Sequence, residues 1–408
     1  MVRGTTTILN SNGGIFPRVS VNEILRSIQY KDICQMMVVD CSMRSAAIKI
    51  ERMLHRGCNH RTLDDWVQRE GNAIVVQIDK QSREALEECG FDSNTGKVKE
   101  GVVLKEGMTH PEIAVVSQET VVEIIRKYNE NREENEKINE RWVNGVYEKT
   151  QEGVNISIDD VGVTEQKGTG RQKNSPKKET KKRVENTVIH IGYGIGTYIL
   201  TGLGIFSVVK NALAFLLKNN LLMNQMLTFF VDGAPNIKNA IQSLFGWRPY
   251  KIILDWHHLD KKCAERLSLI MKGRKLRNET YKILVKFLWY GELDAAIAYL
   301  KAIPEDKIKS KGLENIELLI AYFERNREFL PCYALRKELG LRNSSNRVEK
   351  SNDLVVAVRQ KNKGMSWSRP GSTALANITA VIINHEISAW NYTGHISYTV
   401  NYHDKIAV

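Results

Sequence analysis

One stretch constrains the fold more than any other, the strand–helix–strand pattern at residues 226–262. Two short apolar runs, residues 227–231 and 252–254, each end at an aspartate, Asp232 and Asp255. Between them, apolar residues recur with helical spacing. Open α/β sheets hold ligands and catalytic groups at the carboxyl ends of their strands, so we expect both aspartates at such an edge. Carboxylates there favour hard divalent cations.

The residues before this stretch predict three further strands. The first is an alternating run that ends at Asp159 and Asp160, and two glycine-rich runs follow it. With the helix that comes next, the order is β β β α β α β. This is the order of the ribonuclease H-like fold, an α/β fold whose mixed sheet carries helices on both faces. The strands are predicted at residues 154–158, 188–191 and 197–201, and the helix at residues 207–217.

The rest of the chain divides by its patterns. From residue 259 to about residue 341 every apolar pattern is helical, which predicts an all-helical insertion into the core. The predicted parts are an N-terminal region at 1–150, the first part of the core at 151–258, the insertion at 259–342, a second part of the core at 343–371 with a glutamate helix and a basic loop, and a C-terminal tail at 372–408.

The N-terminal region is predicted to be mainly helical. Helical patterns occupy residues 21–33 and 41–55, and a third begins near Thr62. The two helices around Gly57 fit a helix-turn-helix that reads DNA, or any small helical subdomain. Further on, a run of apolar residues predicts a strand at residues 73–78, and one long charged helix is predicted at residues 121–148 as a link to the core.

Three carboxylates are candidate ligands for a metal pair: Asp159, Asp232 and Glu349. Each has an ordinary structural alternative, because aspartate is common in turns and Glu349 could complete a capping box with Asn346. Together, in this order along one predicted sheet, they favour phosphoryl transfer by divalent cations. Asp160 is an alternative to Asp159, but the alternation of the strand puts Asp159 on the more polar face.

A second motif, Asp255-x-x-His258, closes the last predicted strand and opens the insertion. An aspartate and a histidine at this spacing could support the metal ligands, orient a DNA strand or relay a proton. The structural alternative is an aspartate at the end of a strand beside partly buried histidines.

The charge balance indicates a polyanionic partner. The net charge is +12 and the isoelectric point about 9.2, which favours nucleic acid. The loop at residues 167–183 carries eight Lys or Arg, so it is either a solvated tip or a grip on phosphates. The segment from Arg359 to Arg369, with a predicted exposed Trp367, is expected to hold phosphates as well.

Features that are absent from the sequence bear on the cellular compartment and on a possible zinc site. The six cysteines are scattered without a CxxC pair, so free thiols are favoured over a zinc site at Cys58 and His60. No apolar run of about 20 residues free of charge is present, and the N-terminus lacks the order of a signal peptide. We expect a cytoplasmic, nucleoid-associated protein without a membrane partner.

These motifs together resemble the DDE transposases of bacterial insertion sequences, and among them the Mutator-like branch, which is marked by a Cys/Asp-x-x-His motif after the second aspartate. The resemblance spans roughly residues 154–371. It rests on VNISIDDVGV around Asp159, on the Asp-Gly at 232–233 followed by a helix, on the motif at 255–258, on the helical insertion, and on NRVEKSN followed by RQKNKGMSWSRPG.

The resemblance implies a function and the residues that carry it. Asp159, Asp232 and Glu349 would bind Mg²⁺ or Mn²⁺, and Asp255 and His258 would form the auxiliary motif. The protein would be a homo-oligomer that cleaves double-stranded DNA at element ends and joins it to target DNA. The alternatives are a ribonuclease H-like nuclease without strand transfer, and an inactive or domesticated copy that only binds DNA.

Overall fold

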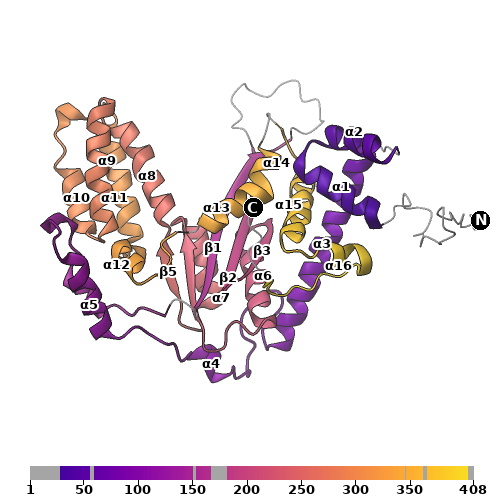
Figure 1. Ribbon diagram of the computed structural model, residues 1–408, viewed down its shortest axis with the longest axis horizontal. Coiled ribbons are helices and arrows are strands. Elements are labelled where there is room, and N and C mark those ends of the chain that lie inside the picture. The colour runs from indigo at the N-terminus through magenta and orange to yellow at the C-terminus, as the bar shows by residue number, and fades with distance from the viewer. Residues whose placement is uncertain are drawn as a thin grey trace, which may run out of the picture.

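A five-stranded mixed sheet lies at the centre of the protein (Figure 1). The computed structural model describes residues 28–55, 59–149, 153–166, 182–344, 346–361 and 365–402, without the side chains of residues 346, 347 and 349. The strand order is β3-β2-β1-β4-β5. The first three strands are antiparallel, and β4 and β5 run parallel to β1. The strands are β1 (Gly153–Thr164), β2 (Arg183–Tyr193), β3 (Gly196–Leu203), β4 (Met226–Val231) and β5 (Lys251–Leu254). The predicted α/β class and the antiparallel meander are therefore confirmed.

Helices cover both faces of the sheet. On one face, α6 (Ile205–Lys218) packs on β2, β3 and α7 (Pro235–Phe245), with Phe215 of α6 stacked on Tyr198 of β3. On the other, α13 (Asn346–Asn352) packs on β1 and β2, and α15 (Arg369–Ile383) on β2 and β3. All six residues of β4 are buried, because this parallel strand is covered on both sides.

The N-terminal helices belong to the same hydrophobic core. They are α1 (Ile28–Asp40), α2 (Met43–Leu54) and α3 (His60–Glu88). The helix α3 lies against both α6 and α15. A Cβ on Gly71 would lie 2.4 Å from the backbone of Ala374, so glycine permits this close approach of two helices. Figure 1 shows these helices with α15 and α16 (Ile387–Thr393) on one side of the sheet.

The structure corrects two predictions for residues 21–78, and part of a third concerns residues that the structure does not describe. The strand predicted at 73–78 is wrong, because these residues are the middle of α3 and bury Ile74 and Ile78 at helical spacing. The cap of α3 is Asn59 rather than Thr62, since Asn59 Oδ1 accepts a hydrogen bond from the Arg61 N–H at 2.9 Å. Residues 21–27 and 56–58, including the predicted turn at Gly57, lie outside the described residues.

The single long helix predicted at residues 121–148 is also wrong. The helix α5 (Gln118–Asn129) ends at Asn129, and Asn131 has a left-handed φ of 61°. The chain continues through the short 3₁₀ turns η1 (Glu134–Glu136) and η2 (Glu140–Asn144). Between α3 and α5 the chain forms one short helix, α4 (Glu106–Thr109), and is otherwise irregular.

The predicted all-helical segment after residue 258 is confirmed. It starts at Trp256, directly after β5, and stands beside the sheet on the side away from α3 (Figure 1). Its own core includes Phe230, Ile253 and Leu254 of the sheet. Its elements are α8 (Trp256–Ile270), α9 (Arg274–Trp289), α10 (Leu293–Lys301), η3 (Glu305–Lys307), α11 (Gly312–Arg325), η4 (Arg327–Phe329) and α12 (Tyr333–Glu338).

The late helix contains a π-helical turn. After α13, the turn η5 (Asp353–Ala357) has π geometry and leads into α14 (Val358–Gln360). A π turn holds one extra residue, and such turns are frequent at functional sites. The predicted C-terminal tail belongs to the hydrophobic core, because most of α15 is buried.

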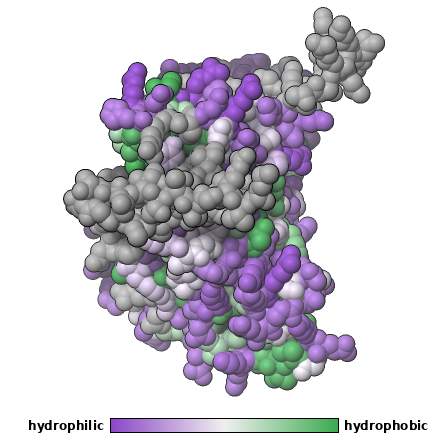
Figure 2. Space-filling view, turned by 90° about the vertical axis from the view of Figure 1, so that its right-hand side faces the viewer, coloured by the Kyte–Doolittle hydropathy of each residue, from purple (hydrophilic) through white to green (hydrophobic). Residues whose placement is uncertain are grey.

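The surface on the side of α1, α2 and α16 is mainly hydrophilic, with small separate hydrophobic patches (Figure 2). Among the described residues, no helix combines the length and the apolar character that a membrane span requires.

Candidate active site

Three aspartates from the parallel part of the sheet lie in one row. Ser157 pairs with Phe230, and the same register continued by two residues places Asp159 level with Asp232, just after the end of β4. Neighbouring strands of a sheet lie about 4.8 Å apart. Val231 pairs with Leu254, which extends the row to Asp255. The prediction that β1 ends at Asp159 is wrong, because β1 continues to Thr164 along β2. The strand β4 ends one residue before Asp232, however, so Asp159 lies where its parallel neighbour stops.

Asp159 is the residue around which the other groups gather. Its Oδ1 accepts a hydrogen bond from the Asp160 N–H at 2.9 Å, and its Oδ2 accepts one from Asn352 Nδ2 at 2.5 Å. His258 Nε2 lies 3.9 Å from the same Oδ2. Residues from β1, α8 and α13, nearly 200 positions apart in sequence, therefore meet at one carboxylate.

Asp160 faces the other side of the sheet. Its Oδ1 accepts a hydrogen bond from Thr187 Oγ1 of β2 at 2.7 Å. Successive side chains of a strand point to opposite faces, so only one of the two aspartates can join His258 and Asn352. That residue is Asp159.

Asp232 ends β4 in a tight turn. Its Oδ1 accepts a hydrogen bond from the Ala234 N–H at 2.8 Å, and its carbonyl oxygen accepts one from the Tyr322 hydroxyl at 2.9 Å. Gly233 has a φ of 86°, and a Cβ there would lie 2.8 Å from the side chain of Asn326. The Asp-Gly pair therefore forms a turn, which was the structural alternative to a role in metal binding. The same turn also fixes the position of Asp232 at the end of the strand.

Asp255 has a structural part in the motif with His258. Its carboxylate caps α8, with Oδ1 accepting hydrogen bonds from the N–H groups of His257 at 2.7 Å and His258 at 3.2 Å. The residue is fully buried. The cap fixes the first turn of α8, and this turn carries His258 to Asp159.

Glu349 lies on α13, which crosses β1 and β2, and its side chain is outside the described residues. Asn352, which was not predicted as a site residue, follows Glu349 by one helical turn and contacts Asp159 directly. The i, i+3 spacing on one helix was the available signal.

The site concentrates buried negative charge. The pKa of Asp159 is raised to about 6, mainly by burial, while the charge of His258 lowers it and the charges of Asp232 and Asp160 raise it. Burial also raises the pKa of Asp160, and the charges of Glu185 and Asp232 add to this effect. Such a cluster is costly to hold without positive charge.

This cost leads to a stability prediction. The Asp159 pKa in the folded protein is about 6 against an ordinary 3.8, so folding favours the protonated acid. Stability without divalent cations should therefore fall as the pH rises from about 4 to 6, with the full cost present above pH 6. Asp159→Asn, which carries no charge, should stabilise the metal-free protein by roughly 1–3 kcal/mol at pH 7.5.

The measurement is urea unfolding of both proteins in EDTA at pH 4.5 and pH 7.5. The advantage of the variant should shrink at the lower pH. An equal difference at both values would show that Asp159 ionises without cost.

The oxygen donors at the site are of the kind that divalent cations prefer. Among the described residues, no group of three or more His, Cys, Asp or Glu side chains has the geometry of a metal site, and the third predicted ligand is Glu349, whose side chain is not described. Asp159 and Asp232 supply hard carboxylate oxygens. Asn352 Oδ1 is buried and has no hydrogen-bond partner, so an unused neutral oxygen also lies at the site.

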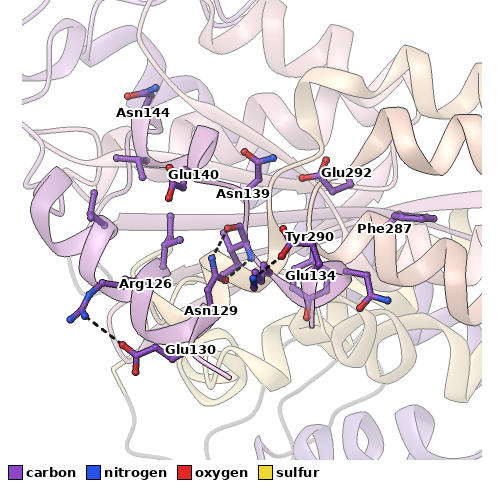
Figure 3. A pocket seen from close by; sticks show the side chains of 16 residues that line it. Arg126, Asn129, Glu130, Glu134, Asn139, Glu140, Asn144, Phe287, Tyr290 and Glu292 are labelled. Atoms are coloured by element: carbon purple, nitrogen blue, oxygen red, sulfur yellow. Dashed lines mark hydrogen bonds and ion pairs between the residues drawn. The ribbon is translucent and has the colours of Figure 1, made fainter. Parts of the chain in front are cut away.

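A pocket away from these residues lies between α5 with its following 3₁₀ turns and α9 (Figure 3). It has a volume of about 1130 Å³ and is lined by side chains such as Arg126, Asn129, Glu140 and Tyr290. It contains none of the candidate site residues. Four glutamates and two basic side chains line it, and Arg126 and Glu130 pair with one another at 3.5 Å. We assign no chemistry to it.

The segment predicted to hold phosphates is largely structural. Arg359 is buried, and its Nε donates to the Val38 carbonyl of α1 at 2.7 Å. Trp367, predicted to be exposed, is buried, and its Nε1 donates to the Gln360 carbonyl at 3.0 Å. Arg369 is exposed and pairs with Glu165 at 3.1 Å. Of the basic loop predicted at 167–183, residues 167–181 lie outside the described part of the chain.

Comparison with known proteins does not assign this chain to a family. The chain matches no protein-family model and none of the curated proteins with which it was compared.

Proposed function

We propose that this protein is a DDE-type DNA transposase, which cleaves DNA at the ends of an element and joins the freed 3′-hydroxyl to target DNA. The observation that carries the proposal is the level placement of Asp159 and Asp232 on neighbouring parallel strands, with His258 at Asp159. Further support comes from α13, the helix of Glu349, which packs across β1.

The fold supports the same proposal. The order β3-β2-β1-β4-β5, with an antiparallel meander and two parallel strands, is what a ribonuclease H-like core requires. The helical segment after β5 separates Asp255 from α13 in sequence, as the proposed insertion does. The meeting of His258 and Asn352 at Asp159 bridges it in space.

Each residue has a part in the proposed reaction. Asp159, Asp232 and Glu349 would hold Mg²⁺ or Mn²⁺, and such cations, when bound, activate an attacking oxygen and stabilise the leaving one. Asp255 fixes the first turn of α8, which places His258 Nε2 3.9 Å from Asp159 Oδ2. Asp160 lies on the opposite face and remains outside the site.

The test uses the purified full chain and labelled duplexes that carry the DNA flanking its own gene, with Mg²⁺ or Mn²⁺. Cleaved and joined products would support transposition. Cleavage without joining would indicate the nuclease alternative. Binding without metal-dependent cleavage would overturn the enzyme proposal and leave a DNA-binding copy.

The tip of the helical insertion offers a surface for the DNA backbone. We define the insertion tip as residues 271–277 and 305–311, which the antiparallel bridge between Met271 and Ile308 joins. It carries seven Lys or Arg against two acidic residues. None of the seven pairs with a carboxylate of the described residues. The three basic residues in the first turn of α9 oppose the helix dipole, so their positions favour an external anion over local stability.

Reversing charge at the insertion tip should weaken DNA binding. We expect the triple variant Lys272→Glu, Arg274→Glu, Lys275→Glu to lose at least about tenfold in affinity at moderate salt, because several phosphate contacts would be lost. The slope of log affinity against log salt should also fall by about 0.9 for each lost contact. Fluorescence anisotropy with a labelled duplex over a salt series measures both.

A matched triple reversal at exposed residues remote from the tip serves as the control: Lys80→Glu, Arg83→Glu and Lys105→Glu. Both variants change the net charge equally. If both reduce affinity to the same extent, the effect is one of total charge, and the tip is not the binding surface.

A further inference from the structure

Asn352 is the residue at the site that the proposed triad leaves unexplained. It is 6 % exposed, and its Nδ2 donates to Asp159 Oδ2 at 2.5 Å. The oxygen of the same amide, Oδ1, is buried without a hydrogen-bond partner. A buried amide oxygen without a donor is costly, and a bound ion or a water molecule is the usual partner of such a group.

The neighbours of Asn352 restrict what this ligand can be. Asp159 offers two carboxylate oxygens with about four acceptor positions, of which the N–H of Asp160 and the amide of Asn352 use two. Asp232 lies level with Asp159 on the next strand. An ionised carboxylate has no proton to donate to the amide oxygen, whereas a hard cation is a partner that all these oxygens can share.

The backbone holds Asn352 in this position. It is the last residue of α13, and the π turn Asp353–Ala357 begins directly after it. Val355 and Val356 within the turn are both fully buried, which anchors the turn in the core. The same helix carries Glu349 one turn earlier, so the packing of α13 against β1 sets the backbone positions of both residues.

We propose that Asn352 is a neutral oxygen ligand of the divalent cation held by Asp159 and Asp232, and that its Nδ2 orients the Asp159 carboxylate for this cation. This inference rests on the proposed metal-dependent function and adds to the predicted triad a residue that the triad does not contain. Direct coordination satisfies the buried Oδ1 while the hydrogen bond to Asp159 remains.

The test measures Mn²⁺ binding rather than activity. The full chain and its variants are titrated with Mn²⁺ by electron paramagnetic resonance, and their Tm values are recorded in EDTA and in Mn²⁺. Asn352→Ala removes the oxygen and should weaken Mn²⁺ binding by about ten- to a hundredfold. Asn352→Asp adds a charge beside Asp159, so its Tm should fall in EDTA and rise more than that of the wild type on addition of Mn²⁺.

The matched control is Asn384→Asp. Asn384 is also 6 % exposed, and its side chain bonds both backbone groups of Ile199 in β3, away from the aspartates. This variant should lose stability equally with and without Mn²⁺. If Asn352→Asp behaves like the control and Asn352→Ala retains the wild-type affinity, then Asn352 has only a structural role and the inference is overturned.

A different result would reach the proposed function itself. Wild-type protein that shows no Mn²⁺ binding, or binding that Asp232→Asn leaves unchanged, overturns both the metal-dependent function and the part of Asn352. Binding that Asp232→Asn weakens and the Asn352 variants do not overturns this inference alone.

Discussion

Asp232→Asn is expected to reduce metal-dependent DNA cleavage on the order of 10³-fold, while DNA binding and the fold persist. A metal ligand contributes several kcal/mol of charge stabilisation in the transition state, and each 1.4 kcal/mol is a factor of about ten. Asparagine keeps the acceptor for the Ala234 N–H that shapes the turn, so the loss should be one of charge. Single-turnover cleavage of a labelled duplex, with anisotropy for DNA binding and circular dichroism for the fold, measures all three.

The comparison is with Asp255→Asn. Asp255 caps α8 through one oxygen, and asparagine is an equally good capping residue. This variant should therefore retain much more activity than Asp232→Asn. If the two variants lose activity equally, Asp255 acts in the reaction itself, and our reading of it as the cap that positions His258 is wrong.

The largest expected effect on stability comes from Phe215→Ala. Phe215 is fully buried in α6, its ring centroid lies 4.2 Å from that of Tyr198, and it meets Tyr398 edge-on at 5.2 Å. Removing a buried ring of this size costs about 3–5 kcal/mol. The loss should also loosen the C-terminal segment that Tyr398 anchors beside α6.

Urea unfolding measures the free-energy change, and amide hydrogen exchange of residues 394–402 measures the local effect. Phe206→Ala is the matched control, because Phe206 lies on the same helix and is 41 % exposed. Its change should stay within about 0.5 kcal/mol. Equal destabilisation by both variants would indicate that helix formation by α6, rather than the aromatic cluster, sets the stability.

Elements with regular apolar spacing could be predicted from the sequence. The run of buried residues in β4, the amphipathic α7 and the following β5 were all predicted, because burial on both faces or on one stripe leaves a local record. The helical character of residues 259–342 was predicted for the same reason.

Features that depend on contacts between residues far apart in sequence could not be predicted from local patterns. Residues 73–78 read as a strand from their β-branched residues, but burial of Ile74 and Ile78 against the core holds them in α3. Arg359 and Trp367 read as surface groups, yet their polar atoms bond Val38 and Gln360 in the interior. The level row of Asp159 and Asp232, and the meeting of Asn352 with Asp159 across 193 positions, follow from strand register and helix packing, which local spacing does not encode.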